Sequence, residues 1–91
     1  MPRYLVERTF SDGLNIPMTA VGARVAKSVV ANNAKLGVTW LHSYVTTDRK
    51  QTYCIYDAPT PDAIRMAAKN NELPVERIIE VSVLDPYFYR A

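Results

Sequence analysis

The period with which apolar side chains recur changes several times along the chain, and each change predicts a new element. Short segments in which valine, isoleucine and aromatic residues alternate with polar ones are typical of half-buried strands. Apolar residues spaced three or four positions apart are typical of helices instead. We therefore expect strands over residues 4–10, 38–46, 51–57 and 75–84, and helices over residues 17–36 and 61–69.

Proline, glycine and hydroxyl residues lie where these elements should begin and end. Pro17 and Pro61 suit the first turn of a helix, where the missing N–H is not needed, and Thr60 suits an N-cap. Gly37 follows the first helix at the position that favours a left-handed backbone. The connection over residues 47–50 is short enough to join two antiparallel strands as a hairpin.

The expected order of elements is strand, helix, strand, strand, helix, strand, which is typical of a ferredoxin-like α+β fold, βαββαβ. Because each crossover is right-handed, both helices should lie on one face of a four-stranded antiparallel sheet. We expect a single domain over residues 1–91, with an aromatic C-terminal tail over 85–91. The other face should be covered by a second copy, by the tail or by a ligand, because monomers rarely expose a large apolar patch. The thin core of such a small chain also favours a homodimer.

Composition and charge argue against several classes of function. The chain carries 11 basic and 9 acidic side chains, and no basic stripe is interleaved with aromatic residues, which argues against nucleic-acid binding. No run approaches the roughly 18 apolar residues that a membrane-spanning helix needs. One cysteine cannot form an intramolecular disulfide, and the N-terminus does not resemble a secretory signal. We therefore expect a soluble cytoplasmic protein that binds neither nucleic acid nor membrane.

Most of the side chains that can carry chemistry lie on the two middle strands. They are the only histidine, His42, the only cysteine, Cys54, and the tyrosines Tyr44 and Tyr56. Strict alternation places Trp40, His42 and Tyr44 on one side of the first of these strands. The same rule puts Cys54 and Tyr56 together on the second. Because histidine titrates near neutral pH without perturbation, His42 is the leading candidate for a functional residue.

The last strand supplies a carboxylate. Its residues Ile79, Val81 and Val83 alternate with Glu80. We expect this aliphatic row to face the helices and Glu80 to face the open side of the sheet. If His42 points to the same side, an imidazole, a tyrosine and a carboxylate converge there.

Each candidate also has an ordinary structural interpretation. His42 is consistent with a half-buried histidine bonded to a backbone or tyrosine partner, and Glu80 with an ion pair to Arg8 or another arginine. Cys54 is typical of a small buried hydrophobic residue rather than of a reactive thiol. One histidine and one cysteine cannot build a closed structural zinc site within one subunit. A histidine with carboxylates, especially across a dimer interface, can still hold a metal weakly.

The segment HSYVTTDRKQTYCIYDAP, residues 42–59, resembles a bacterial family of small domains of unknown function that includes nickel-binding, nickel-responsive proteins. The similarity is strongest in the Tyr-Cys-x-x-acid-Ala-Pro signature at residues 53–59. It continues through 61–63 and 73–74 to 80–81, whereas the N-terminal half matches only in pattern. The resemblance implies a dimeric ferredoxin-like fold and a divalent metal such as nickel.

The nickel-binding members of that family are rich in histidine on the first strand and carry a further histidine in the second helix. Here the first strand has Glu7 and Arg8, and the helix has Ala67 and Ala68, so His42 is the one matching imidazole. The resemblance therefore supports the fold and the dimer and leaves metal binding open.

Three functional hypotheses follow. The first is a homodimer that binds a divalent metal such as nickel, or a small ligand, near His42. Its expected neighbours are Tyr44, Tyr56 and Glu80, with His42 and Glu80 as metal ligands. The second is a cofactor-independent oxygenase, isomerase or cyclase with a pocket between sheet and helices, in which His42 is the general base and a tyrosine, Tyr44 or Tyr56, binds an oxyanion. The third is a structural or interaction module whose tail, residues 85–91, docks on a partner.

Overall fold

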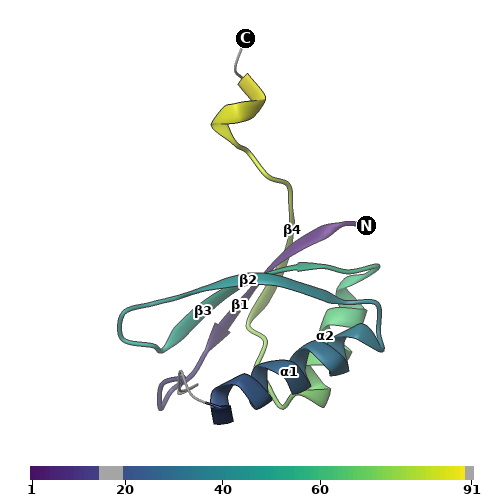
Figure 1. Ribbon diagram of the computed structural model, residues 1–91. Coiled ribbons are helices and arrows are strands. Elements are labelled where there is room, and N and C mark those ends of the chain that lie inside the picture. The colour runs from purple at the N-terminus through teal and green to yellow at the C-terminus, as the bar shows by residue number, and fades with distance from the viewer. Residues whose placement is uncertain (15–19, 90–91) are drawn as a thin grey trace.

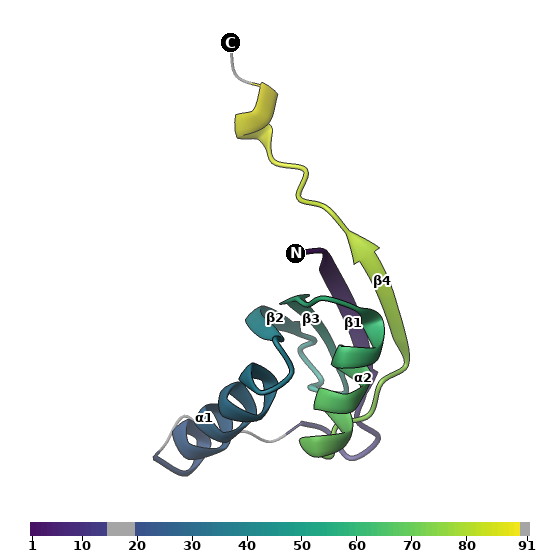
Figure 2. The same ribbon diagram turned by 90° about the vertical axis from the view of Figure 1, so that its right-hand side faces the viewer.

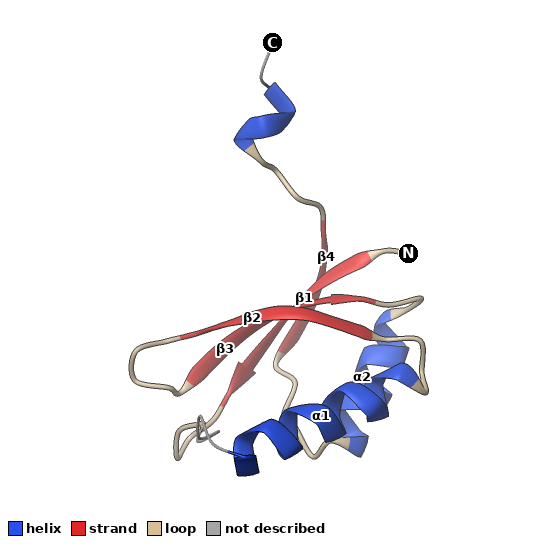
Figure 3. Ribbon diagram, viewed as in Figure 1, coloured by secondary structure: helices blue, strands red, loops and turns tan. Residues whose placement is uncertain are grey.

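The predicted ferredoxin-like fold is confirmed by the computed structural model, which describes residues 1–14 and 20–89. Along the described chain the elements are β1 (Arg3–Thr9), α1 (Ala20–Ala34), β2 (Thr39–Val45), β3 (Gln51–Asp57), α2 (Pro61–Asn70), β4 (Arg77–Val81) and the 3-10 helix η1 (Pro86–Tyr89). The strands form an antiparallel sheet in the order β2-β3-β1-β4, and α1 and α2 lie together on one side of it (Figures 1 and 3). None of the described helices is long and apolar enough to cross a lipid bilayer.

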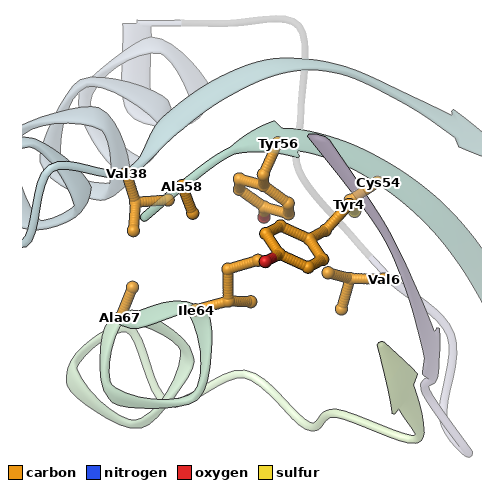
Figure 4. Packing of buried hydrophobic residues seen from close by; sticks show 8 residues of the cluster. All are labelled: Tyr4, Val6, Val38, Cys54, Tyr56, Ala58, Ile64 and Ala67. Carbon is orange, nitrogen blue, oxygen red and sulfur yellow. The ribbon is translucent and has the colours of Figure 1, made fainter. Parts of the chain in front are cut away.

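The hydrophobic core lies between the sheet and α2. Alternate residues of β1 and β3 point toward the helices, and the other residues of each strand point to the open face, the side of the sheet away from the helices. The side chains of the core come from both strands, from α2, and from the α1–β2 and β3–α2 connections: Tyr4, Val6, Val38, Cys54, Tyr56, Ala58, Ile64 and Ala67 (Figure 4). As predicted, Cys54 and Tyr56 share a side, and it is the helix side.

Local sequence signals explain why α2 begins where it does. Thr60 is the N-cap, and its hydroxyl accepts a hydrogen bond from the backbone N–H of Ala63 at 3.2 Å. Pro61 follows in the first turn, where it removes no hydrogen bond of the helix. Asp62 near the N-terminus and Lys69 near the C-terminus complement the helix dipole. The predictions for Thr60 and Pro61 are therefore confirmed.

The first helix covers the sheet less completely than its sequence pattern predicts. Pro17 lies outside the described residues, while Gly37 has the expected positive φ of 71°. Val25 is 44% exposed, although its helical spacing predicts an inward position. The apolar residues of α1 are alanines and valines placed around much of its circumference, so the helix has no long apolar side chain that fills the space to the sheet.

The last strand is shorter than predicted and faces the other way. Residues 75, 76 and 82–84 lie outside β4, and Leu84 is 78% exposed. Ile78 pairs with Val6 and Glu80 with Tyr4, so Ile78 and Glu80 take the helix side, and Ile79 takes the open side. The predicted sides of Glu80 and of Ile79 are therefore wrong. Ile78 and Ile79 are both apolar, so the sequence allows either of them to face the helices. Because Ile78 pairs with buried Val6, it is Ile78 that points inward.

The segment after β4 leaves the body of the domain. It carries η1 away from the sheet and the helices toward the C-terminus (Figure 2). Tyr87 on this segment is exposed, as is Leu84 before it.

Candidate functional site

A β-bulge in β2 decides which side of the sheet the histidine occupies. Trp40 pairs with Tyr56 and His42 pairs with Ile55, so Leu41 is an extra residue that has no counterpart on β3. Trp40 therefore shares the helix side with Tyr56, whereas His42 and Tyr44 share the open face with Ile55. The prediction that Trp40 and His42 lie on one side is wrong, because strict alternation ignores such an extra residue.

The open face is organised in rows that run across the strands. One row consists of His42, Ile55, Leu5 and Ile79, as the strand registers show. We call the last three residues the apolar stripe. The stripe crosses β3, β1 and β4, and His42 stands at its end on β2, which is an edge strand.

An ion pair lies on each side of the apolar stripe. Arg3 Nε donates to Asp57 Oδ1 at 2.9 Å, and Arg77 Nη2 donates to Glu7 Oε1 at 2.7 Å. The hydrogen bond from Arg3 lowers the pKa of Asp57, and the bond to Glu7 raises the pKa of Arg77. Each pair joins one basic and one acidic side chain, so neither adds net charge to this face.

The histidine itself is accessible. His42 is exposed, and its ring meets that of Tyr44 edge to face, with centroids 5.3 Å apart and planes at 85°. Edge-to-face packing of this kind is a favoured arrangement for two aromatic rings. The open face thus presents an imidazole beside a tyrosine and an apolar surface.

The structure brings together only two of the four predicted site residues. His42 and Tyr44 are neighbours on the open face. Tyr56 is buried on the helix side, and Glu80 lies on β4, at the opposite edge of the sheet from β2. The predicted convergence of a carboxylate with His42 is therefore wrong within one chain.

The donor set of one chain does not fit a metal ion. No group of three or more histidine, cysteine or acidic side chains lies close enough to hold one in the part of the chain that the structure describes. Cys54 is buried on the helix side, where its Sγ lies 3.6 Å from Thr52 Oγ1, in keeping with a small buried residue. A nickel ion bound at His42 would need ligands from outside the subunit.

A cavity lies between α1 and the helix side of the sheet. Its volume is about 220 Å³, and its walls include Val25 and Val29 of α1, Trp40 of β2, and Tyr56 of β3. His42 and Tyr44 do not line it. The enzyme hypothesis required a pocket that contains the histidine, so the arrangement of these residues counts against it.

Arg8 is a residue of this cavity that sequence reasoning missed. The sequence pattern gives it as an ion-pair partner of Glu80, yet it is buried on the helix side and takes part in none of the ion pairs formed by the described residues. The signal was present in the alternation of β1, because Arg8 follows Tyr4 and Val6 at a period of two.

Together, the βαββαβ topology, the open sheet face and the cavity define a small ferredoxin-like α+β protein with two separate candidate sites. The sequence model of the nickel responsive protein SCO4226-like family matches residues 4–81, and the chain belongs to this family. The fold is similar to the crystal structure of SCO4226 from Streptomyces coelicolor A3(2), with a TM-score of 0.70 and 12% sequence identity, over 91% of this chain and 99% of that one. A search of curated protein sequences returns no match.

Proposed function

We propose that this protein is a homodimer that binds a divalent metal ion, such as nickel, at a site that two copies complete around His42. The observation that carries the proposal is an exposed imidazole at the end of the apolar stripe, on the sheet face that the helices leave uncovered. Membership in a nickel-responsive family supports nickel as the first metal to test.

The open face has the properties of a self-complementary interface. Leu5 and Ile55 are half-buried and Ile79 is exposed, so the apolar stripe offers area that a second copy can remove from water. The flanking pairs Arg3–Asp57 and Glu7–Arg77 are each neutral overall, so two such faces meet without repulsion between like charges. A two-fold interface uses the same patch on both subunits, as this face allows.

The proposal that two copies share the metal site follows from the number of imidazole ligands that one chain provides. Imidazole is a good ligand for nickel, but one chain supplies a single accessible imidazole on this face. A dimer doubles that number. Glu80 lies on the helix side of β4, so a second copy that joins through the open face does not direct this carboxylate toward His42.

Nickel titration tests the metal site. We expect saturable binding of NiCl₂ to the wild-type protein by isothermal titration calorimetry, and at least tenfold weaker binding to His42→Ala, because losing a ligand costs more than losing a residue that orients one. Asp48→Ala, in the exposed β2–β3 connection, is the matched control and should bind as the wild type does. Glu80→Gln measures whether that carboxylate contributes. Absence of binding, or unchanged binding to His42→Ala, would contradict the proposal.

Light scattering after gel filtration tests the interface. We expect the wild-type protein to elute as a dimer and Ile55→Asp as a monomer, because the substitution places a charge within the apolar stripe. Val30→Asp adds the same charge at an exposed position on α1 and should remain dimeric. A chain shortened by residues 86–91 should also remain dimeric. Loss of the dimer on this truncation would instead favour the interaction-module hypothesis, and a monomeric wild type would refute the interface.

A further inference from the structure

Arg8 is a buried charge that forms no ion pair with the described residues. The residue is 3% exposed, and its Nε and Nη1 atoms make no hydrogen bond to the described residues. Arginine keeps its positive charge in proteins, and buried charges are almost always paired. A guanidinium in this state has the capacity to bind an anion.

The neighbours of Arg8 do not neutralise it. The guanidinium carbon lies 5.6 Å from the centroid of the Tyr56 ring. Burial raises the pKa of Tyr56 to about 12, which outweighs the opposing effect of the Arg8 charge, so this tyrosine stays neutral at physiological pH. Thr52 faces Arg8 across β1 and β3 but is uncharged. The sequence of residues 15–19, which lie outside the described part of the chain, contains no acidic side chain.

Arg8 lines the cavity between α1 and the sheet, whose remaining walls are largely apolar. Val25 and Val29 of α1 face Trp40 and Cys54 of the sheet across the cavity. Val25 and Val45, which also line it, are both exposed, so the cavity communicates with solvent. An apolar cavity of about 150 Å³ accommodates benzene. A volume of about 220 Å³ therefore has room for a ring or short alkyl chain together with a carboxylate.

We propose that this cavity binds a small monocarboxylate with an apolar body. The carboxylate pairs with the guanidinium of Arg8, which presents its N–H groups in the fork geometry that carboxylates match, and the apolar body lies against the valines of α1. A doubly charged phosphate is disfavoured, because it would bring a second charge into walls that supply one cation. The site lies on the opposite side of the sheet from His42, so it does not rest on the proposed metal site.

The fluorescence of Trp40 reports on the cavity directly. It is the only tryptophan of the chain, it lines the cavity, and its Nε1–H donates to Ser43 Oγ at 2.8 Å, which holds the ring in place. We expect a saturable change of fluorescence with benzoate or hexanoate. The uncharged analogues benzamide and hexanol should bind roughly ten- to hundredfold more weakly, because they carry no negative charge to form an ion pair with Arg8. Inorganic phosphate should give no change.

Three variants separate the parts of the site. Arg8→Met should bind benzoate and benzamide equally weakly, whereas Arg24→Met, which removes an exposed arginine of α1, should keep the preference for benzoate. Ala26→Leu fills the cavity without changing its charge and should weaken both probes. Circular dichroism shows whether each variant is folded. Any one of three results would overturn the proposal. The wild type binds benzoate and benzamide equally, the preference for benzoate persists in Arg8→Met, or no probe gives a saturable change of fluorescence.

Discussion

Replacing Arg8 with methionine is expected to raise the free energy of unfolding by about 1–4 kcal/mol when no ligand is bound. The effective cost of burying an ion is several kcal/mol, and the contact with the Tyr56 ring returns about 2 kcal/mol of it. Methionine keeps an unbranched apolar stem of similar length, so little packing is lost. Urea denaturation followed by the fluorescence of Trp40 measures the difference between the two proteins.

The control for this substitution is Arg24→Met, which removes the same charge from an exposed position on α1. Its unfolding free energy should stay within about 0.5 kcal/mol of the wild type, as is usual for surface substitutions. A destabilised Arg8→Met would show that the guanidinium is paired in solution. A stabilised one would mean that this residue is kept at a cost to stability, as is common for residues with a function.

Replacing Ile64 with alanine should lower the free energy of unfolding by an amount comparable to the increase expected for Arg8→Met. The side chain is 1% exposed and extends from α2 toward Tyr4 and Tyr56 in the core (Figure 4). We expect the free energy of unfolding to fall by about 2–5 kcal/mol, because the substitution removes apolar contacts and leaves a cavity. Urea denaturation provides the measurement. For a small domain this is a large share of the total stability.

Met66→Ala on the same helix is the matched control, since Met66 is 57% exposed. It removes a side chain of similar size from the outer surface of α2 and should change the free energy of unfolding by less than about 0.5 kcal/mol. Equal losses in the two variants would show that α2 does not bury Ile64 as described.

The features that could be predicted from the sequence are those set by local chemistry. The Thr60–Pro61 start of α2 and the positive φ of Gly37 follow from capping and backbone preferences of single residues. The order of strands and helices follows from changes of hydrophobic period, and the handedness of crossovers then leaves few topologies. For this reason the fold could be predicted from the sequence.

The candidate site was less accessible because it depends on how strands pair. The adjacent residues Ile78 and Ile79 leave two possible faces for β4, and only its register with β1 selects one. That register removes Glu80 from the open face. None of the described acidic side chains pairs with Arg8, and no local sequence pattern reports that absence.

The extra residue Leu41 has an evolutionary consequence for a chain of this fold. Losing its codon would make Trp40 and His42 sequence neighbours, and regular alternation would keep them opposite Tyr56 and Ile55, on the two faces that they already occupy. The indole of Trp40 would stay on the helix side and the imidazole of His42 on the open face. This extra residue can therefore be gained or lost without moving either ring through the sheet, and the change is confined to the local bend and twist of the edge strand.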